Sequence, residues 1–452
     1  MPREAVVIGG GLAGMLTVRA LLGHADTVTV IERDRYPDGP RFRKGVPQAR
    51  HPHVLLSGGR RALEELLPGT GAAFAEAGAH RLELPRDLLI RYGNGWQHRF
   101  HEGRHALLSC SRPLLDHVVR DRVLRAAAST ATRVEVVQAA EATGLLGTAD
   151  RVTGVRFRVR DGGRGERELP AELVVDASGR GSRAPEWLVA LGRSAPRQET
   201  VDTGLGYASR RLTLASPPTA GVYINPAPGT PRGGSLLPLE GGDWLLMLYG
   251  WRRHRPPTDE DGFLDFLASL AHPYIHDSVK EAQPRSAIHG FHNTANRRLH
   301  YSDPGGVPEG FVAVADAACS FNPVYGQGMS VVALGALALR DTLARGGLRP
   351  GLAGTAQRAV SRAADAAWLI AVSTDRPHAG SATLADRVRI RYLSRLIARS
   401  VTDPVVGAAY RDVSSLTAPP ARLIAPCVVL RALLRPCRPG LPVPPPEAEH
   451  GT

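Results

Sequence analysis

The sequence predicts an α/β protein in which a Rossmann-like nucleotide-binding domain carries an inserted antiparallel-sheet domain and continues into a helical C-terminal tail. Two observations favour this fold class. Residues 5–34 run from an apolar stretch through a glycine triplet into a helical pattern and a second apolar stretch, which is the order of elements in a βαβ unit. Residues 196–294 instead contain short alternating segments separated by turn residues, as antiparallel strands with one buried face do.

The glycine triplet lies where a strand turns into a helix. Val6–Ile8 is expected to form the strand, and Gly9, Gly11 and Gly14 occupy the G-x-G-x-x-G positions before a helix over 12–22. Gly9 permits a tight turn, Gly11 lets backbone approach a pyrophosphate, and Gly14 allows close helix–strand packing. Because the N-terminus of a helix offers free N–H groups, this turn is expected to bind a dinucleotide.

An acidic residue and a long loop follow the second strand of this unit. Glu32 comes directly after the apolar segment 27–31 and is placed to accept hydrogen bonds from a ribose. The loop 35–53 is rich in Pro, Gly and Arg, and it lies beside the expected ligand site. Its polar candidates either contact a ligand or only tie down the loop, and they are Arg43, Gln48, His51 and His53.

Three further segments are candidates for contacts with the nucleotide. Ser111 is a suitable N-cap for a helix that starts at Arg112, whose side chain either reaches phosphate or is solvated. A strand ends at Asp176 before a Gly/Ser/Arg turn, where the carboxylate either contacts the ligand or only satisfies the turn. Another strand, 311–314, leads to Asp316 and then through a loop to a helix from Met329.

These patterns divide the chain into four parts. The nucleotide-binding domain is expected to be discontinuous, and the sheet domain is expected to be inserted between its segments. The expected boundaries are 1–80, 105–195 and 295–354 for the first domain, 81–104 and 196–294 for the sheet domain, 355–435 for the helical region, and 436–452 for a proline-rich, disordered tail.

Composition and charge exclude several classes of function. The formal net charge is +13, but the arginines are scattered and only Lys44 and Lys280 represent lysine, so no nucleic-acid partner is expected. The four cysteines form no C-x-x-C pair and no metal-ligand spacing. No export signal and no apolar run of spanning length is visible, so a cytoplasmic protein is expected. The apolar segment 423–434 is expected to pack on the body rather than to contact a membrane.

The glycine triplet with Glu32, the Asp176 turn and the Asp316 strand occur in an order that resembles the FAD-containing monooxygenases of the aromatic-hydroxylase and squalene-epoxidase type. The resemblance implies that Asp316 binds the ribityl chain, although the usual glycine before it is Ala315. It also implies a D-G turn at Asp176, here with Ala177 and Ser178 before Gly179. The implied FAD-binding residues are Gly9, Gly11, Gly14, Glu32, Arg33, Arg43, Arg112, Asp176 and Asp316, with Pro323, Gly328 and Met329 beside the isoalloxazine ring.

A narrower resemblance covers the chain to about residue 362. The blocks Arg43–His51, Gly95–Phe100, Asn296–Tyr301 and Phe321–Ser330 are similar to the flavin epoxidases of polyether-antibiotic biosynthesis, the monensin and lasalocid types, whereas the chain from about Asp375 is less similar. The resemblance implies epoxidation of C=C bonds in a polyketide or terpenoid intermediate through a flavin C4a-hydroperoxide. The alternative is an FAD-dependent aromatic hydroxylase.

Two other classes fit the sequence less well. Flavin halogenases carry a W-x-W-x-I-P motif that has no counterpart around the five tryptophans. Binding proteins of the same fold, such as the prenyl-GTPase escort proteins, need no flavin chemistry, and the intact Gly11, Glu32 and Asp316 argue against that class.

The expected cofactors and partners follow from this resemblance. FAD and O2 are expected, with electrons from NAD(P)H or from a separate flavin reductase, and the partner is a small-molecule alkene. Because the flavin carries the chemistry, no catalytic side chain and no metal ligand is assigned. The candidate pocket residues either line a substrate site or fill the core of the sheet domain, and they are Trp96, Trp244, Leu246 and Leu248.

Overall fold

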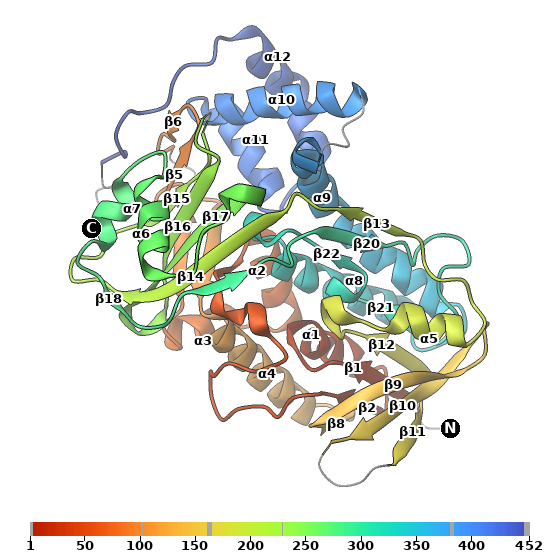
Figure 1. Ribbon diagram of the computed structural model, residues 1–452. Helices are drawn as coiled ribbons and strands as arrows, with labels where there is room; N and C mark the ends of the chain where they lie inside the picture. Colours follow the sequence, from red (N-terminus) through yellow and green to blue (C-terminus); the bar gives the residue numbers. More distant parts are fainter. Residues whose placement is uncertain (1–2, 101–102, 161–164, 228, 380–383, 447–452) are drawn as a thin grey trace.

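A five-stranded parallel sheet forms the centre of the nucleotide-binding half (Figure 1). The computed structural model describes residues 3–100, 103–160, 165–227, 229–379 and 384–446. The strand order is β21-β12-β1-β2-β8, and every neighbouring pair is parallel. The strands are β1 (Glu4–Ile8), β2 (Thr27–Ile31), β8 (Arg133–Val137), β12 (Leu173–Asp176) and β21 (Phe311–Ala313).

Other elements cover both faces of this sheet. Successive side chains of a strand point to opposite faces, so each face presents apolar side chains that need a partner. Val7 of β1 packs into a cluster with the helices, whereas Val6 packs into a cluster with β9, β10 and α5 on the other face. The elements concerned are α1 (Leu12–Leu21), α4 (Arg112–Ala128), α8 (Gly328–Gly346) and α9 (Leu352–Ala379) on one face, and β9 (Ala140–Gly147), β10 (Val152–Val159), β11 (Glu166–Pro170) and α5 (Ala184–Ala190) on the other.

The inserted domain is an eight-stranded sheet beside the first one (Figure 1). Its main order is β18-β14-β17-β16-β15-β5-β6, and β19 also pairs with β14. The expected antiparallel pattern holds for most pairs, but β15 pairs with β5 in parallel because β5 comes from the separate segment before α4. The strands are β5 (Leu88–Tyr92), β6 (Gly95–Trp96), β14 (Leu205–Thr213), β15 (Gly221–Ile224), β16 (Arg232–Pro238), β17 (Asp243–Trp251), β18 (Gln283–Pro284) and β19 (His289–Phe291), and α6 (Glu260–Ala268) and α7 (Tyr274–Val279) pack on one face.

Two small three-stranded sheets connect the halves. Their orders are β3-β7-β4 and β13-β20-β22. They consist of β3 (His53–Leu55), β7 (His105–Cys110), β4 (His80–Leu84), β13 (Gln198–Val201), β20 (Asn296–Leu299) and β22 (Cys319–Ser320); α2 (Ser57–Leu66) and α3 (Thr70–Glu76) follow β3.

The C-terminal helices begin inside the nucleotide-binding half. Helix α9 packs on α8, and the amide of its Gln357 bonds the backbone N and O of Ala313 on edge strand β21 at 2.8 and 3.1 Å. A boundary at residue 355 therefore cuts a helix that completes the first domain. The helices that follow are α10 (Leu384–Ser400), α11 (Pro404–Ser414) and α12 (Pro426–Leu434).

The proline-rich tail is attached to the inserted sheet as far as it is described. The backbones of Leu441 and Trp96 exchange two hydrogen bonds of 3.0 Å, and Gly440 N–H donates to Asn94 O at 2.8 Å. The expected disorder is therefore wrong for residues 436–446, because an extended strand can use the unpaired backbone of an edge strand; residues 447–452 lie outside the described part. None of the described helices has the length and apolar character needed to cross a membrane.

Candidate functional site

A cavity of about 310 Å³ extends from the carboxyl ends of β1 and β2 to the inserted sheet. Its walls come from the glycine turn, the loop 43–54, the turn after β12, the loop 321–329 and strands β14, β15 and β17. Ligands of open α/β sheets bind at this edge of the sheet, where the strand order changes direction around the first strand.

The three glycines of the βα turn have different roles. Gly9 has φ 96°, and a Cβ there would lie 2.7 Å from Ala177 O. A Cβ at Gly14 would lie 1.8 Å from Gly9 O, so this glycine lets α1 approach β1 and does not line the cavity. A Cβ at Gly11 would meet only Arg43 Nη2, at 3.8 Å, and would occupy the cavity itself. Because no side chain caps the N-terminus of α1, its N–H groups are available to an anion.

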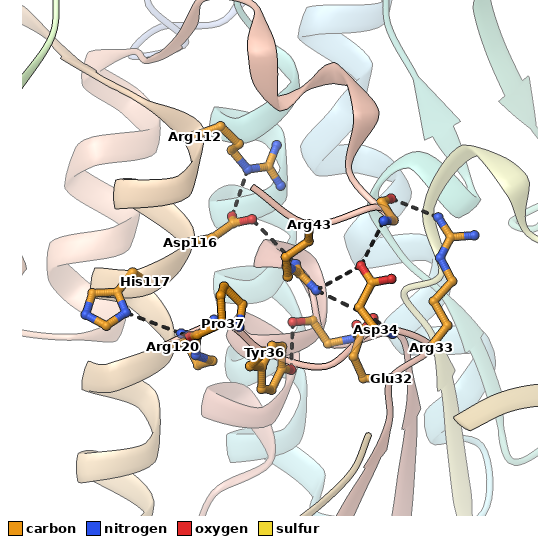
Figure 2. A network of polar contacts seen from close by, with 12 residues as sticks. Glu32, Arg33, Asp34, Tyr36, Pro37, Arg43, Arg112, Asp116, His117 and Arg120 are labelled. Carbon is orange, nitrogen blue, oxygen red and sulfur yellow. Dashed lines mark hydrogen bonds and ion pairs between the residues drawn. The ribbon is translucent and has the colours of Figure 1, made fainter. Parts of the chain in front are cut away.

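Glu32 lies at the end of β2, on the cavity wall. One carboxylate oxygen accepts a hydrogen bond from Gly10 N–H at 2.6 Å, and the other accepts one from Asp34 N–H at 2.8 Å. The Tyr36 hydroxyl donates to Gly10 O at 2.9 Å from the same side (Figure 2). These bonds fix the carboxylate beside the glycine turn, as ribose recognition requires.

Arg43 is a buried cation among three carboxylates (Figure 2). Its guanidinium lies 3.5 Å from Glu32, 3.8 Å from Asp34 and 3.6 Å from Asp116, and its side chain is 5% exposed. Burial alone lowers the pKa of Arg43, but the carboxylates outweigh it and the pKa is raised. Asp116 also accepts a hydrogen bond of 2.7 Å from Arg112. Arg43 therefore ties β2 to α4 and offsets part of the negative charge of these three carboxylates.

Asp176 does not reach the cavity. Its carboxylate is fully buried and accepts hydrogen bonds from Ser178 N–H at 3.0 Å, Ser178 Oγ at 2.6 Å and Ser182 Oγ at 2.5 Å. Burial raises its pKa even though these three hydrogen bonds favour the charged form. The expectation that Asp176 contacts the ligand is wrong, because its oxygens organise the turn instead. The turn itself lines the cavity through Ser178, Gly179, Gly181 and Arg183.

Asp316 lies on the cavity wall after β21. Burial raises the pKa of its carboxyl group, while Arg180, Arg112 and Arg297 oppose that shift. The preceding Ala315 has φ 51°, a left-handed conformation that costs a non-glycine residue about 1–2 kcal/mol. The alanine in place of the family's glycine is therefore strained, and the strain lies next to a residue of the site.

The loop after Asp316 delivers the N-terminus of α8 to the cavity. Pro323, Gly328 and Met329 line it, and no side chain caps the first turn of the helix. The N-terminus of α8 thus offers uncapped N–H groups and the positive end of the helix dipole to a ligand.

The opposite end of the cavity is mainly apolar and aromatic. Its walls are formed by the segment His51–Val54, by Phe321 and Val324, and by three side chains of the inserted sheet, Tyr207, Tyr223 and Met247. Burial lowers the pKa of His51 to about 3 and that of His53 to about 4, so both imidazoles are neutral at pH 7.

Comparison with known proteins decides the family. A family model described as "FAD binding domain" matches residues 3–346. The chain belongs to the FAD binding domain family. This family includes flavin-dependent monooxygenases, and the chain is thus a member of a flavoenzyme family.

This flavoprotein is similar in sequence to one curated relative and similar in fold to two solved structures. It is 33% identical over 380 residues to protein Rv3254 of Mycobacterium tuberculosis, and the match covers 81% of this chain and 79% of the relative. The flavin-dependent brominase Bmp2 superposes with a TM-score of 0.69 at 14% identity over 92% of this chain and 93% of that chain. The structure of pqsL, a probable FAD-dependent monooxygenase from Pseudomonas aeruginosa, gives 0.58 at 16% identity over 92% and 100%. At these identities the two structures show a shared fold.

Glycines on the wall of this cavity leave room for the close approach of FAD. Besides Gly11, three glycines on the wall would each project a Cβ into space with nothing within 4 Å, namely Gly179, Gly181 and Gly328. Backbone at these positions leaves room for a ligand that side chains would fill. Of the residues expected to hold the cofactor, the structure brings ten to the cavity, Gly9, Gly11, Glu32, Arg33, Arg43, Arg112, Asp316, Pro323, Gly328 and Met329; Gly14 lies behind the turn and Asp176 beneath it. Among the described residues, no three or more His, Cys, Asp or Glu side chains are grouped to hold a metal ion.

The expected substrate-pocket residues lie on the wrong face of the inserted sheet. Trp244, Leu246 and Leu248 alternate along β17 and pack with α6 and α7, away from the cavity. Trp96 is fully buried in the same cluster, with its ring centroid 5.1 Å from that of His272 and 5.7 Å from that of Tyr274. These four residues fill the core of the sheet domain, which is the alternative that the sequence left open.

Sequence reasoning missed Tyr207, Tyr223 and Met247 as cavity residues. The run Asp243–Trp251 is apolar at nearly every position, because both faces of β17 are buried. Because apolar and polar residues do not alternate in this run, the sequence does not indicate whether its odd-numbered or its even-numbered residues face the cavity. The loop residues Gln48, His51 and His53, by contrast, were candidates from the sequence and do line the cavity.

Proposed function

We propose that this flavoprotein is an FAD-dependent monooxygenase that epoxidises C=C bonds of a polyketide or terpenoid natural-product intermediate. The observation that carries the proposal is one continuous cavity, which joins the glycine turn of the βαβ unit to an apolar end beneath the inserted sheet. A monooxygenase needs such a connection because the reacting part of the cofactor and the substrate must meet in one space that excludes water.

When bound and reduced by NAD(P)H or by a separate flavin reductase, FAD would supply the activation of O2, from which one oxygen atom would enter the product. The balance is alkene, O2, NAD(P)H and one proton giving epoxide, water and NAD(P)+. The chain's own residues hold the cofactor and the alkene. The N–H groups at the start of α1 and Glu32 would hold the pyrophosphate and ribose, and the start of α8 would stabilise negative charge on the cofactor beside Gly328.

The apolar end would hold the alkene and exclude water. Val54, Phe321, Val324 and Met247 present apolar surface there. Epoxidation requires an oriented alkene and the exclusion of water more than an acidic or basic side chain of the protein. This requirement agrees with the neutral state of the two cavity histidines.

A second function, hydroxylation of an aromatic ring, is favoured by one specific observation. Tyr207, Tyr223 and the His51 imidazole line the same end of the cavity, and aromatic rings pack well against an aromatic substrate. This reaction needs the same cofactor site and differs only in what the apolar end accepts.

Turnover under 18O2 distinguishes the two functions. Purified protein, FAD and NADPH, with a general flavin reductase in a parallel reaction, would be offered a panel of linear polyenes and a panel of phenols. We expect an epoxide that carries one 18O atom. A labelled hydroxylated arene would favour the second function, and product without label from either panel would exclude a monooxygenase.

A further inference from the structure

His51 combines burial with contact to the cavity. It is only 4% exposed, yet it lines the apolar end. Its Nδ1 lies 2.9 Å from the Oγ of Ser209, a fully buried residue of β14. Buried polar groups are normally paired, and this pair joins the loop after β2 to the inserted sheet.

The ring orientation of His51 is held from two sides. Its centroid lies 4.5 Å from that of Tyr207 in an edge-on arrangement and 5.7 Å from that of Phe291. Together with the bond to Ser209, these contacts fix where the second ring nitrogen, Nε2, is presented. Within the described residues, the hydrogen bond of the His51 ring is made by Nδ1, and Nε2 has no hydrogen-bond partner.

The protonation state gives Nε2 a defined chemistry. Burial, with smaller contributions from His53, His289 and Arg50, keeps the pKa of His51 far below 7. A neutral imidazole has one donor nitrogen and one acceptor nitrogen. Because the Ser209 hydroxyl can either donate to Nδ1 or accept from it, Nε2 can present either role to a ligand. A hydroxyl group is the complementary partner, since it too both donates and accepts.

We propose that His51 is a specificity-determining residue whose Nε2 hydrogen-bonds a hydroxyl group of the substrate, and that Ser209 is the positioning residue that orients the imidazole. The inference rests on the proposed function in one respect, that the apolar end of the cavity holds the substrate. It assigns the substrate class as an apolar molecule that carries an alcohol or phenol oxygen close to the carbons that react.

Binding to the oxidised, FAD-loaded protein tests this without turnover. Two matched pairs of probes would be titrated by the change in flavin absorbance: farnesol with farnesyl methyl ether, and 2-naphthol with 2-methoxynaphthalene. We expect the wild-type protein to bind the hydroxyl member of at least one pair about tenfold more tightly, as one hydrogen bond of about 1.4 kcal/mol provides. The pair that shows the preference also distinguishes an alkene site from an aromatic site.

Three variants and a control separate recognition from structure. His51→Leu is expected to reduce the preference to about onefold, His51→Gln to restore part of it through its terminal amide, and Ser209→Ala to reduce it about threefold. His80→Leu removes a histidine whose Nε2 bonds Leu239 O outside the cavity and is expected to keep the full preference. A role for His51 in tying down the loop alone would change affinity for both members of a pair equally.

Three results overturn the inference. The first is an equal affinity of the wild-type protein for both members of each pair. The second is a failure of all four probes to change the flavin spectrum, and the third is a full hydroxyl preference in His51→Leu. If the His51→Leu variant does not fold, the Ser209→Ala result decides, since that change removes only one oxygen. Failure of the monooxygenase proposal is seen separately, as absence of 18O in the product, so the two failures are distinguishable.

Discussion

The two ends of the cavity are built in different ways. At the nucleotide end, the expected pyrophosphate and ribose positions depend on one continuous stretch, residues 5–34, with the loop up to Arg43 and the start of α4 folded against it. The turn after β12 and the segment 315–329 complete the wall. The apolar end is assembled from five segments that are far apart in the sequence, namely 51–54, β14, β15, β17 and 321–326. In this protein each contact expected to hold the cofactor has its own local sequence pattern, whereas the residues of the apolar end are recognisable only in the tertiary arrangement.

The two ends also differ in charge. At the nucleotide end, Glu32, Asp34 and Asp116 surround Arg43, so charged groups of both signs lie close together (Figure 2). At the apolar end, His51 and His53 are held neutral. Changes at the first end are therefore expected to act on FAD affinity, and changes at the second end on substrate.

The largest effect on FAD affinity is expected from a side chain placed in the glycine turn between β1 and α1. Gly11→Val would place two methyl groups in the space where the pyrophosphate would lie, and we expect FAD affinity to fall at least 100-fold. The measurement is FAD binding by fluorescence quenching, together with the colour of the purified protein. Gly354→Val is the matched control, because its Cβ would meet only the flexible Arg358 side chain, at 3.4 Å; wild-type absorbance in Gly11→Val would show that the turn does not bind the cofactor.

Two aspartates near the ends of strands, Asp176 and Asp316, are expected to differ in their effect on FAD binding. Asp316 lines the cavity and Asp176 does not. Asp316→Ala is expected to weaken FAD binding by about 10- to 100-fold, through loss of a charge-assisted hydrogen bond of about 1.5–3 kcal/mol. Asp176→Asn is expected to lower the melting temperature while FAD affinity, measured on the folded protein, changes less than threefold. The reverse pattern would exchange the roles assigned to the two carboxylates.

The apolar end is expected to respond in the opposite way. Met247→Trp would fill part of the cavity, so we expect substrate turnover to fall about tenfold with FAD affinity within twofold of the wild type. Leu246, one residue earlier on β17, packs on the other face, and Leu246→Met, a volume-conserving change, is expected to keep turnover. Equal losses of turnover in the two variants would mean that β17 does not present alternate residues to substrate and core.

The two histidines of the apolar end are also expected to affect the pH dependence of stability. His51 and His53 have folded pKa values of about 3 and 4, below the unfolded value of 6.5. Below pH 6.5 the unfolded chain binds more protons, so the stability that is present above pH 6.5 falls as the pH decreases towards 4. Each histidine contributes up to about 1.4 kcal/mol per pH unit in this window. Urea unfolding at pH 7, 6 and 5 should show a smaller decrease in His51→Gln than in the wild type, and parallel curves would contradict the buried neutral state.

The sequence predicted the nucleotide end because each of its requirements is carried by a local pattern. Gly9, Gly11 and Gly14 meet steric limits set by the turn itself, and Glu32 follows from the length of the next strand. Asp176 was misplaced because a strand-end aspartate that caps its own turn has the same local pattern as one that contacts a ligand.

The residues that line the apolar end could not all be predicted from the sequence, because their positions depend on the assembled sheet. Whether Met247 or Leu246 faces the cavity depends on which face of the inserted sheet receives α6 and α7. The pairing of His51 with Ser209 joins residues 158 positions apart. The tail was predicted disordered from its proline content, but residues 440 and 441 pair with an edge strand that is visible only once the sheet is assembled.

A crystal structure of the protein with FAD bound tests most directly the central claim, that one cavity joins the cofactor turn to the inserted sheet. We expect the pyrophosphate at the N–H groups that begin α1, the ribose at Glu32, and the isoalloxazine ring beside Gly328 and Met329, with one face open to His51 and Met247. A ring whose both faces are covered by protein, or one that is separated from Met247 by closed side chains, would contradict it.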